Sequence, residues 1–199
     1  GLVGSEMCIR DRECVVAPGF SPDAREILAS KPNLRLLELS AAAVDAAGPD
    51  HVRSILGGLL VQDLDDRPCE PDTWTVATQR PPSIQEKRDL EFAWRLVRHV
   101  RSNAIVVARD GQSLGIGAGQ MNRVGSARLA LEAAGDKAAG SVLASDGFFP
   151  FDDTVRLAAE HGIAAVIHPG GSLRDAESIQ ACDELGMTML LTGRRHFLH

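Results

Sequence analysis

From Glu13 onward, short apolar runs rich in β-branched residues alternate with segments whose apolar residues recur at helical spacing. This alternation is typical of α/β layered domains, and it is most regular after Pro82. The predicted strands are residues 14–17, 34–39, 54–63, 104–109, 112–116, 141–145, 163–168 and 187–191. The predicted helices are residues 21–30, 83–100, 122–134, 153–161 and 173–185.

Local signals predict where several helices begin and end. Ser21 followed by Pro22 is typical of a helix start, and Ser83 with Glu86 three residues later predicts a capping box. Ser172 is predicted to cap the last helix and Gly186 to end it. The helix predicted at residues 83–100 has an apolar stripe that predicts core positions at Leu90, Trp94 and Val97.

Turn residues predict how the strands connect. The pair Asp110-Gly111 lies between two strand-like runs and predicts a hairpin. Gly57-Gly58 interrupts the run 54–63 and suggests a bulge or a close backbone approach. Residues 14–17 are predicted to be a buried strand. The closing alternation of strands and helices predicts parallel pairing with right-handed crossovers.

Two segments fall outside this pattern. Residues 1–12 have neither helical nor strand periodicity, and we interpret them as a cloning-derived or sequencing-derived scar outside the fold. Residues 63–73 concentrate acids and prolines, which predicts an exposed connection and a subdomain boundary near residues 63–82. The folded part is therefore taken as residues 13–199.

Composition excludes several classes of function. The chain has 199 residues and a net charge of −6, which argues against a nucleic-acid partner. Apolar runs such as Ala104–Ala108 are far shorter than the roughly 20 residues of a membrane span, so no membrane association is expected. Four scattered cysteines lack zinc-site spacing and predict reduced thiols in a cytosolic protein: Cys8, Cys14, Cys69 and Cys182.

Ligands of α/β sheets usually bind beyond the carboxyl ends of strands, and three such places carry candidate chemistry. The first is the glycine-rich segment Gly115–Gln120, which leads into a helix with Arg123 near its start. Its glycines, amides and arginine suit a phosphate or carboxylate, but they fit a tight hairpin-to-helix junction equally well. The glycine spacing also differs from that of the dinucleotide fingerprint.

The second place follows the strand 141–145, where Phe148, Phe149 and Phe151 fall within four residues. Core packing is the default for any one phenylalanine, but a loop does not easily bury three, so we predict contact with a flat heterocycle. The third is His168–Ser172, which suits an anion or simple capping by Ser172.

Asn103 and the chain end are unremarkable when taken alone. A buried asparagine before a strand often only satisfies backbone groups. The end, residues 193–199, is basic and aromatic, and such tails are usually frayed, so Arg195 and His199 need a further argument to enter a site.

Four segments taken together resemble a known family: RSNAIVVARDGQSLGIGAGQMNRVGSAR, ASDGFFPFDD, IHPGGSLRD and the terminal RRHF. They are similar to the bifunctional purine biosynthesis enzymes that combine AICAR transformylase and IMP cyclohydrolase. APGFSPDAREIL, LRLLEL and GGLLVQD fit the same family upstream, so the resemblance covers about Glu13 to His199.

The resemblance implies formyl transfer from 10-formyltetrahydrofolate to the 5-amino group of AICAR. It also implies cytidine-deaminase-like α/β layers with a mixed sheet and no zinc site or other metal, a cytoplasmic location, and a homodimer with sites at the subunit interface. Carried over by position, the AICAR contacts are Asn103, Arg123, Phe148 and Arg195. The folate contacts are Val124, Asp153, Ser172 and Leu173.

These residue types suit the implied roles. Arg123 and Arg195 suit the anionic end of a ribonucleotide, and Phe148 suits stacking on its imidazole ring. Asp153 suits the amino and ring N–H edge of a pterin. Asn103 suits the carboxamide or the developing oxyanion. This contact would support catalysis, because the attacking aryl amine is a poor nucleophile that needs orientation and charge stabilisation.

One family feature is missing from the 199 residues. The family's catalytic Lys-His pair lies in a KHxNPCG motif, and this motif is not found here. The resemblance places it upstream of Glu13, together with the cyclohydrolase domain. The expectation is therefore a carboxyl-terminal fragment of the transformylase domain that has a substrate half-site, lacks the catalytic pair and is inactive alone.

Two other interpretations remain open at this point. One is a dinucleotide-binding oxidoreductase built on the glycine-rich junction, against which the glycine spacing counts. The other is a non-catalytic α/β module that serves assembly. Binding of AICAR and folate, of NAD, or of none of these would distinguish the three.

Overall fold

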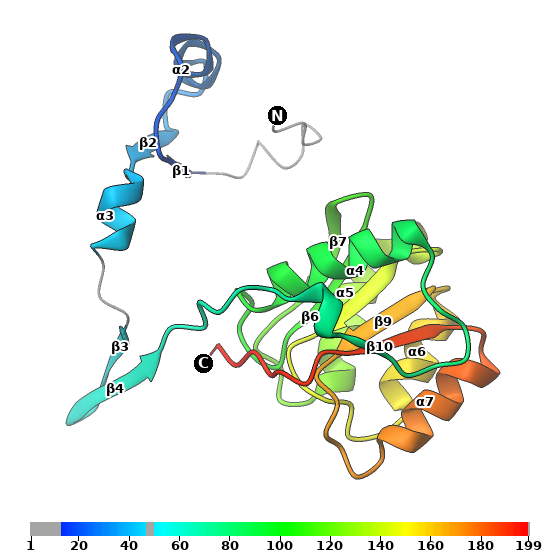
Figure 1. Ribbon diagram of the computed structural model, residues 1–199. Coiled ribbons are helices and arrows are strands. Elements are labelled where there is room, and N and C mark those ends of the chain that lie inside the picture. Colours follow the sequence, from blue (N-terminus) through cyan, green and yellow to red (C-terminus); the bar gives the residue numbers. More distant parts are fainter. Residues whose placement is uncertain (1–12, 47–49, 199) are drawn as a thin grey trace. The chain divides into compact units, whose positions relative to one another are not determined.

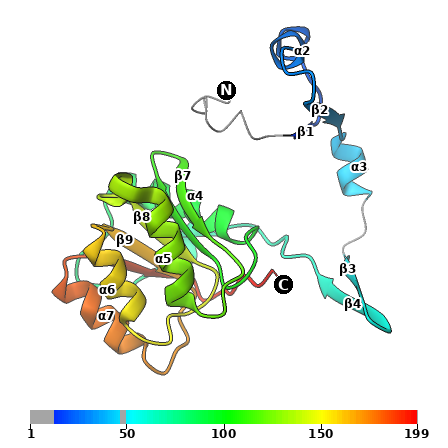
Figure 2. The same cartoon turned by 180° about the vertical axis from the view of Figure 1, so that it is seen from behind.

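The computed structural model describes residues 13–46 and 50–198, and Figures 1 and 2 show its elements from opposite sides. Residues 1–12, interpreted above as a scar, and His199 lie outside the described residues. The chain divides into two compact units between Leu64 and Asp65. This division falls inside the acidic and proline-containing connection.

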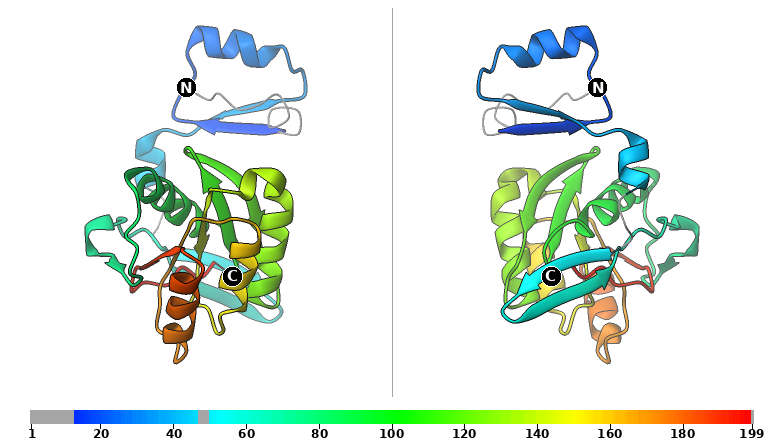
Figure 3. Two further views of the ribbon diagram at one scale, coloured as in Figure 1. Left: turned by 90° about the vertical axis from the view of Figure 1, so that its right-hand side faces the viewer. Right: turned by 90° about the vertical axis from the view of Figure 1, so that its left-hand side faces the viewer.

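The first unit contains two small sheets (Figure 3). One sheet is a parallel pair and the other is an antiparallel hairpin. Ser21 accepts a hydrogen bond from the amide of Ala24 at 3.2 Å, as the predicted helix start requires. The strands are β1 (Cys14–Ala17), β2 (Arg35–Glu38), β3 (Asp50–Ile55) and β4 (Gly58–Asp63). The helices are α2 (Pro22–Ala29) and α3 (Ala41–Asp45).

Two expectations for this unit are wrong. Residues 54–63 are not one strand with a bulge, because the chain reverses at Leu56-Gly57, where Gly57 has a φ of 81°. A positive φ costs little for glycine, so the glycine pair marks a hairpin turn. The strand 14–17 is not buried, since Val16 is 57% exposed and β1 pairs only with β2 among the described strands.

The second unit has a six-stranded mixed sheet in the order β5-β10-β9-β8-β6-β7. The central strands β8, β9 and β10 are parallel, as predicted, while β5, β6 and β7 pair in antiparallel fashion. The strands are β5 (Thr75–Val76), β6 (Ile105–Arg109), β7 (Gln112–Gly117), β8 (Val142–Ser145), β9 (Ala165–His168) and β10 (Thr188–Leu191). This mixed α/β architecture confirms the predicted fold class.

Helices cover both faces of this sheet. In Figure 2, α5, α6 and α7 lie in front of the strands, and α4 lies behind them. Alternate residues of β6 serve the two cores, since Ile105 packs with α5 and Val106 packs with α4. The predicted stripe Leu90, Trp94 and Val97 is buried. The helices are α4 (Ile84–Val97), α5 (Arg123–Ala134), α6 (Asp153–Glu160) and α7 (Asp175–Glu184), with short 3₁₀ turns η1 (Pro71–Thr73) and η2 (Gly135–Ala138).

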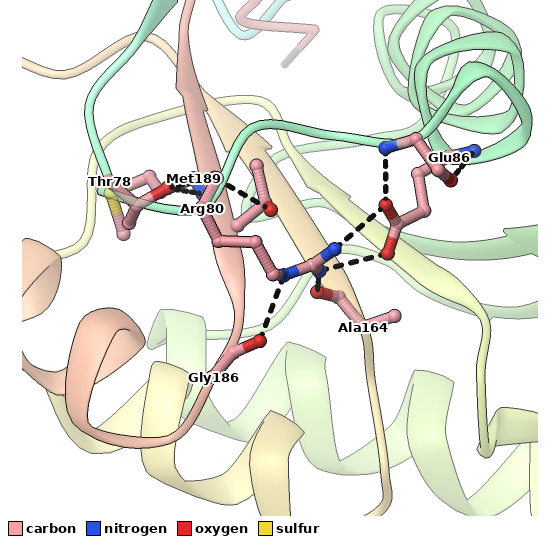
Figure 4. Close-up of polar contacts among 8 residues, drawn as sticks. Thr78, Arg80, Glu86, Ala164, Gly186 and Met189 are labelled. Atoms are coloured by element: carbon pink, nitrogen blue, oxygen red, sulfur yellow. Dashed lines mark hydrogen bonds and ion pairs between the residues drawn. The ribbon is translucent and has the colours of Figure 1, made fainter.

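The start of α4 is tied to the amino-terminal side of the sheet by Arg80 (Figure 4). Glu86 completes the predicted capping box with Ser83 and also accepts two bonds from Arg80, at 2.9 and 3.0 Å. The Arg80 guanidinium also donates to the carbonyls of Ala164, at 2.6 Å, and Gly186, at 3.0 Å. Burial raises the pKa of Glu86, but the bonds from Arg80 and Ser83 outweigh burial and hold it below its usual value.

The predicted hairpin of β6 and β7 is present. Asp110 has a φ of 53° and Gly111 has a φ of 68°, so both turn residues adopt the left-handed region. This is the geometry that a two-residue hairpin of the Asp-Gly type needs. The amide of Gly111 also donates to the buried carboxylate of Asp89 at 3.1 Å, which ties the turn to α4.

Candidate functional site

All three candidate places lie along one edge of the six-stranded sheet. Residues 145–153 and 168–172 follow the parallel strands β8 and β9, so they leave the sheet at the same edge. Strand β6 runs the other way, with Ile105 opposite Ser145 and Gly117. The start of β6 and the end of β7 therefore meet the carboxyl ends of the parallel strands, as expected for ligand sites of this architecture.

A buried charge pair forms the centre of this edge. Arg123, the first residue of α5, forms an ion pair with Asp146, whose side chain is 0% exposed. Arg123 also donates to Ser145 Oγ at 2.8 Å and to Asn103 Oδ1 at 2.9 Å. Asp146 in turn accepts from the amide of Ala104, at 3.1 Å, and from the hydroxyl of Ser102. Both buried charges thus have multiple polar partners, as stable burial requires.

This network fixes the side chain of Asn103. Its Oδ1 accepts from Arg123, and its Nδ2 donates to the carbonyl of Gln120 at 2.9 Å. Its backbone carbonyl accepts from Ser126 Oγ at 2.6 Å. Arg123 has been expected to meet the anionic end of a ribonucleotide, yet its guanidinium already has Asp146 as a partner. In this arrangement the Arg123 guanidinium orients the Asn103 amide.

Phe148 and Arg195 form a second, more accessible part of the edge. The guanidinium carbon of Arg195 lies 5.0 Å from the ring centroid of Phe148, which is a cation–π contact. Phe148 is half-buried and Arg195 is exposed. A side chain at Gly171 would come within 3.8 Å of Arg195, so the arginine lies between Phe148 and the loop after β9. A flat ring and a cation therefore lie side by side at this edge.

The three phenylalanines do not form one aromatic face. Phe149 is fully buried and stacks on His168, with the ring centroids 4.5 Å apart. Phe151 is 49% exposed and contacts Arg174, whose guanidinium carbon is 4.8 Å from the ring centroid. The cluster of phenylalanines in the sequence therefore consists of one core residue and two residues nearer the surface.

The four folate candidates lie at or just before the starts of α5, α6 and α7, on one face of the sheet. Val124 is half-buried, Asp153 is exposed, and Leu173 is fully exposed. Asp153 Oδ1 accepts from the amide of Thr154 at 2.7 Å. Within the described residues, no hydrogen bond or ion pair joins these four to Asn103, Arg123, Phe148 or Arg195.

Ser172 is not the cap of α7, which corrects the sequence interpretation. Its Oγ accepts from the amide of Arg174 at 3.1 Å, and α7 begins only at Asp175. Asp175 instead holds the loop, because its Oδ2 accepts from the amides of Gly171, at 2.6 Å, and Ser172, at 3.1 Å. A carboxylate four residues after the pair Gly170-Gly171 is the signal that could have identified it.

His168 fixes the other end of the same loop. Its Nδ1 accepts from the amide of Gly170 at 3.0 Å, so Nε2 carries the proton and faces Met189 Sδ at 3.2 Å. Burial, with a smaller effect from the charge of Arg123, lowers the pKa of His168 to about 3. The ring is therefore neutral and serves as a fixed support for the loop.

The glycines of β7 serve packing. A Cβ atom at Gly115 would lie 1.9 Å from the carbonyl oxygen of Ala130, and one at Gly117 would lie 1.9 Å from that of Ser126. Both oxygens belong to α5, so this helix lies directly on the strand and leaves no room for side chains or for a ligand there. The junction interpretation of this segment is the one that the structure supports.

The carboxyl-terminal segment packs against the rest of the second unit, contrary to the default of a frayed tail. His196 is 4% exposed and stacks on Trp94, with centroids 4.4 Å apart. Asp65 binds both Arg194 and His196 Nδ1. The amide of Ser102 donates to the carbonyl of Leu198 at 2.9 Å. These contacts, which the sequence analysis missed, hold Arg195 in place.

Comparison with known proteins decides which family the chain represents. A profile described as "AICARFT/IMPCHase bienzyme" matches residues 5–133, more than half of the chain. The chain belongs to this family. This result favours the purine biosynthesis interpretation over the oxidoreductase and the assembly module.

Curated relatives agree with this assignment. A "Bifunctional purine biosynthesis protein PurH" from Synechococcus sp. (strain CC9902) is 84% identical over 187 residues, which are 94% of this chain and 36% of that protein. The one from Synechococcus sp. (strain CC9311) is 78% identical over 199 residues, which are 100% of this chain and 38% of that protein. The family member described here thus spans little more than a third of these relatives.

One solved structure resembles this bienzyme family member weakly. RibD from Acinetobacter baumannii (form 2) has a TM-score of 0.35 and 16% identity, covering 52% of this chain and 33% of that chain. Such a likeness carries no argument about fold or function.

Two kinds of feature are absent from the part of the chain that the structure describes: metal-binding clusters and membrane-spanning helices. Within residues 13–46 and 50–198, no group of three or more His, Cys, Asp and Glu side chains is placed to hold a metal ion. Among the described helices, none has the length and apolar character needed to cross a bilayer.

Proposed function

We propose that this chain carries the AICAR-binding part of a transformylase domain and serves formyl transfer from 10-formyltetrahydrofolate to AICAR in purine biosynthesis. One observation carries the proposal: in a member of this family, Asn103, Arg123, Phe148 and Arg195 lie along a single edge of one sheet. A ligand that spans this edge meets an amide, an aromatic ring and a cation.

The roles differ in how directly each residue meets the nucleotide. Phe148 stacks on the imidazole ring, and Arg195 leaves its ring contact to bind the phosphate, for which a guanidinium is well suited. Asn103 holds the carboxamide or the developing oxyanion, because Arg123 and Gln120 already fix its orientation. Arg123 is a positioning residue, held by Asp146.

Folate binding is proposed at the helix starts on the same side of the sheet. The exposed carboxylate of Asp153 accepts bonds from the amino and ring N–H groups of the pterin. Val124 and Leu173 offer apolar contacts, and Ser172 offers a loop held by Asp175. No metal takes part in this scheme.

The partners and location proposed for the chain follow those of the family. We infer a homodimer in which each site lies at the subunit interface, in the cytoplasm, with nucleotide and folate as the small-molecule substrates. The subdomain boundary is proposed to lie in the connection between residues 63 and 82, which contains the division between the two compact units.

The 199-residue chain is proposed to bind AICAR but to turn it over poorly. The KHxNPCG motif that would supply the catalytic Lys-His pair is not present in these residues. General acid–base catalysis commonly contributes about 10²- to 10⁴-fold in rate. Mixing the purified chain with AICAR and 10-formyltetrahydrofolate should therefore give little product, and turnover near that of a full-length relative would refute this part.

Calorimetric titration with AICAR tests the binding site. The Phe148→Leu variant should lose roughly 5- to 150-fold in affinity, because stacking of a base on an aromatic ring contributes roughly 1–3 kcal/mol. Arg195→Gln should also weaken binding. The matched control is Phe151→Leu, because Phe151 lies three residues away with its own arginine contact, at 4.8 Å. Equal losses in Phe148→Leu and Phe151→Leu, or no saturable binding to the folded chain, would overturn the proposal.

A further inference from the structure

A cavity of about 220 Å³ lies on the α4 side of the carboxyl-terminal segment, where the function proposed above assigns no role. Its lining comes from the connection that opens the second unit, from α4 and from the chain after β10. The lining residues that carry the argument are Arg67, Trp74, Trp94, Arg98, Arg194 and His196. The neighbouring residue Arg195 lies against Phe148 instead, so successive residues of this extended segment serve two different sites.

The cavity is positively charged in a chain of net charge −6. Four arginines line it against one glutamate. Arg95 is paired with Glu91, and Arg194 is paired with Asp65. Arg67 and Arg98 have no carboxylate within 4.0 Å among the described residues, and Arg98 donates only to His99 Nε2 and to the carbonyl of Arg67. Two charges in the lining are therefore available to an anion.

Aromatic rings form another part of the lining. Trp74 and Trp94 meet edge to face with centroids 6.4 Å apart, and the indole of Trp94 is covered by His196. Trp94 is only 3% exposed, whereas Trp74 is half-buried and is the indole that offers a surface. A planar group in the cavity would contact Trp74 and gain stacking energy.

His196 adds a polar atom that lacks a partner. Its Nδ1 is bound to Asp65, while its Nε2 is buried and has no hydrogen-bond partner in the described part of the chain. Burial lowers the pKa of His196 although Asp65 opposes this change. The neutral ring therefore carries its proton on Nδ1, and Nε2 is an acceptor. A buried acceptor without a donor is costly, and the ring that carries it forms part of the cavity wall.

From these observations we propose that the cavity binds a small aromatic oxyanion, with Arg67 and Arg98 on the anionic group and Trp74 against the ring. Its volume is below the roughly 300–1,000 Å³ of sites for drug-sized ligands, so the occupant is smaller than a nucleotide. The site is distinct from the proposed AICAR edge and does not depend on it.

The tryptophans provide a direct readout. The chain has two tryptophans and no tyrosine, and both tryptophans line this cavity. Indole emission therefore reports on the cavity alone. Phenyl phosphate is the probe, with inorganic phosphate and phenol as its anionic and aromatic halves. We expect a saturable emission change with phenyl phosphate, weaker binding of phosphate, and no saturable effect of phenol.

Charge variants locate the binding. Arg98→Gln and Arg67→Gln should each weaken phenyl phosphate binding at least tenfold, and Arg67 is exposed, so its replacement leaves folding intact. The matched control is Arg88→Gln, an exposed arginine of α4 that does not line the cavity. It should bind as the parent chain does.

Three results would overturn the proposal. The first is a folded chain whose emission shows no saturable change with phenyl phosphate. The second is a change that Arg67→Gln and Arg88→Gln weaken equally. The third is a change abolished by Arg195→Gln but not by Arg67→Gln, which would assign the anion to the AICAR edge.

Discussion

Replacing Asp146 with alanine is expected to destabilise the second unit strongly. The side chain is 0% exposed, and its removal leaves the Arg123 guanidinium, itself 7% exposed, buried without a countercharge. It also removes the acceptor for the amide of Ala104 and for the hydroxyl of Ser102. Breaking a buried ion pair from one side typically costs about 3–5 kcal/mol. For a chain of this length, that corresponds to a fall of roughly 6–20 °C in melting temperature.

Urea unfolding monitored by circular dichroism measures this free energy. The control is Asp152→Ala, which removes a carboxylate that pairs with the half-exposed Arg156 at 2.6 Å. Exposed pairs of this kind contribute about 0.2–1 kcal/mol. If Asp146→Ala lowers the free energy of unfolding by no more than Asp152→Ala does, the buried pair does not hold the edge of the sheet together and the reasoning is wrong.

Two further predictions concern packing and pH. Gly117→Ala should lower the free energy of unfolding, measured in urea, by about 1–3 kcal/mol, because the added carbon would lie 1.9 Å from a backbone oxygen of α5. Gly19→Ala, with open space around it, should change little; similar costs for both would refute the packing argument. His168 has a folded pKa of about 3, below its unfolded value near 6.5, so the unfolded state binds more protons between these values. Its contribution to stability is complete above pH 6.5 and declines as pH falls toward 3, by up to about 1.4 kcal/mol per pH unit. In the His168→Gln variant, the free energy of unfolding should depend less steeply on pH between 3 and 6.5, by the amount that one proton contributes. An unchanged slope would contradict the assignment.

Local sequence signals predicted most of the second unit. The capping box of Ser83 and Glu86 and the turn pair Asp110-Gly111 act through neighbouring backbone groups, so they hold whatever surrounds them. The parallel order of β8, β9 and β10 followed from the alternation of strands and helices between them.

Features that depend on distant contacts were not predictable in this way. Whether Gly117 approaches a ligand or a helix depends on where α5 packs, and the two arrangements need the same sequence. Asp65 lies 131 residues from His196, so no local sequence signal predicts the contact that holds the carboxyl-terminal segment. Ser172 was predicted to cap α7, but Asp175 accepts from the loop amides instead, because a charged carboxylate is a stronger acceptor than a hydroxyl.

The candidate site was predicted in part. Its residues came from the family resemblance, and the structure adds how they are held. Phe148 and Arg195 are 47 positions apart, and their contact could not be derived from spacing. Asp146 follows a buried strand directly, which is the position where α/β sheets present polar groups.

Backbone amide NMR of the ¹⁵N-labelled chain, titrated with AICAR, tests the central proposal most directly. We expect saturable shifts at the carboxyl edge of the sheet, around Asn103, Arg123, Phe148 and Arg195. We expect none around Arg80, which lies at the amino-terminal side of the same sheet. A folded chain whose amides do not respond to AICAR, or respond only around Arg80, would contradict the assignment of the nucleotide site.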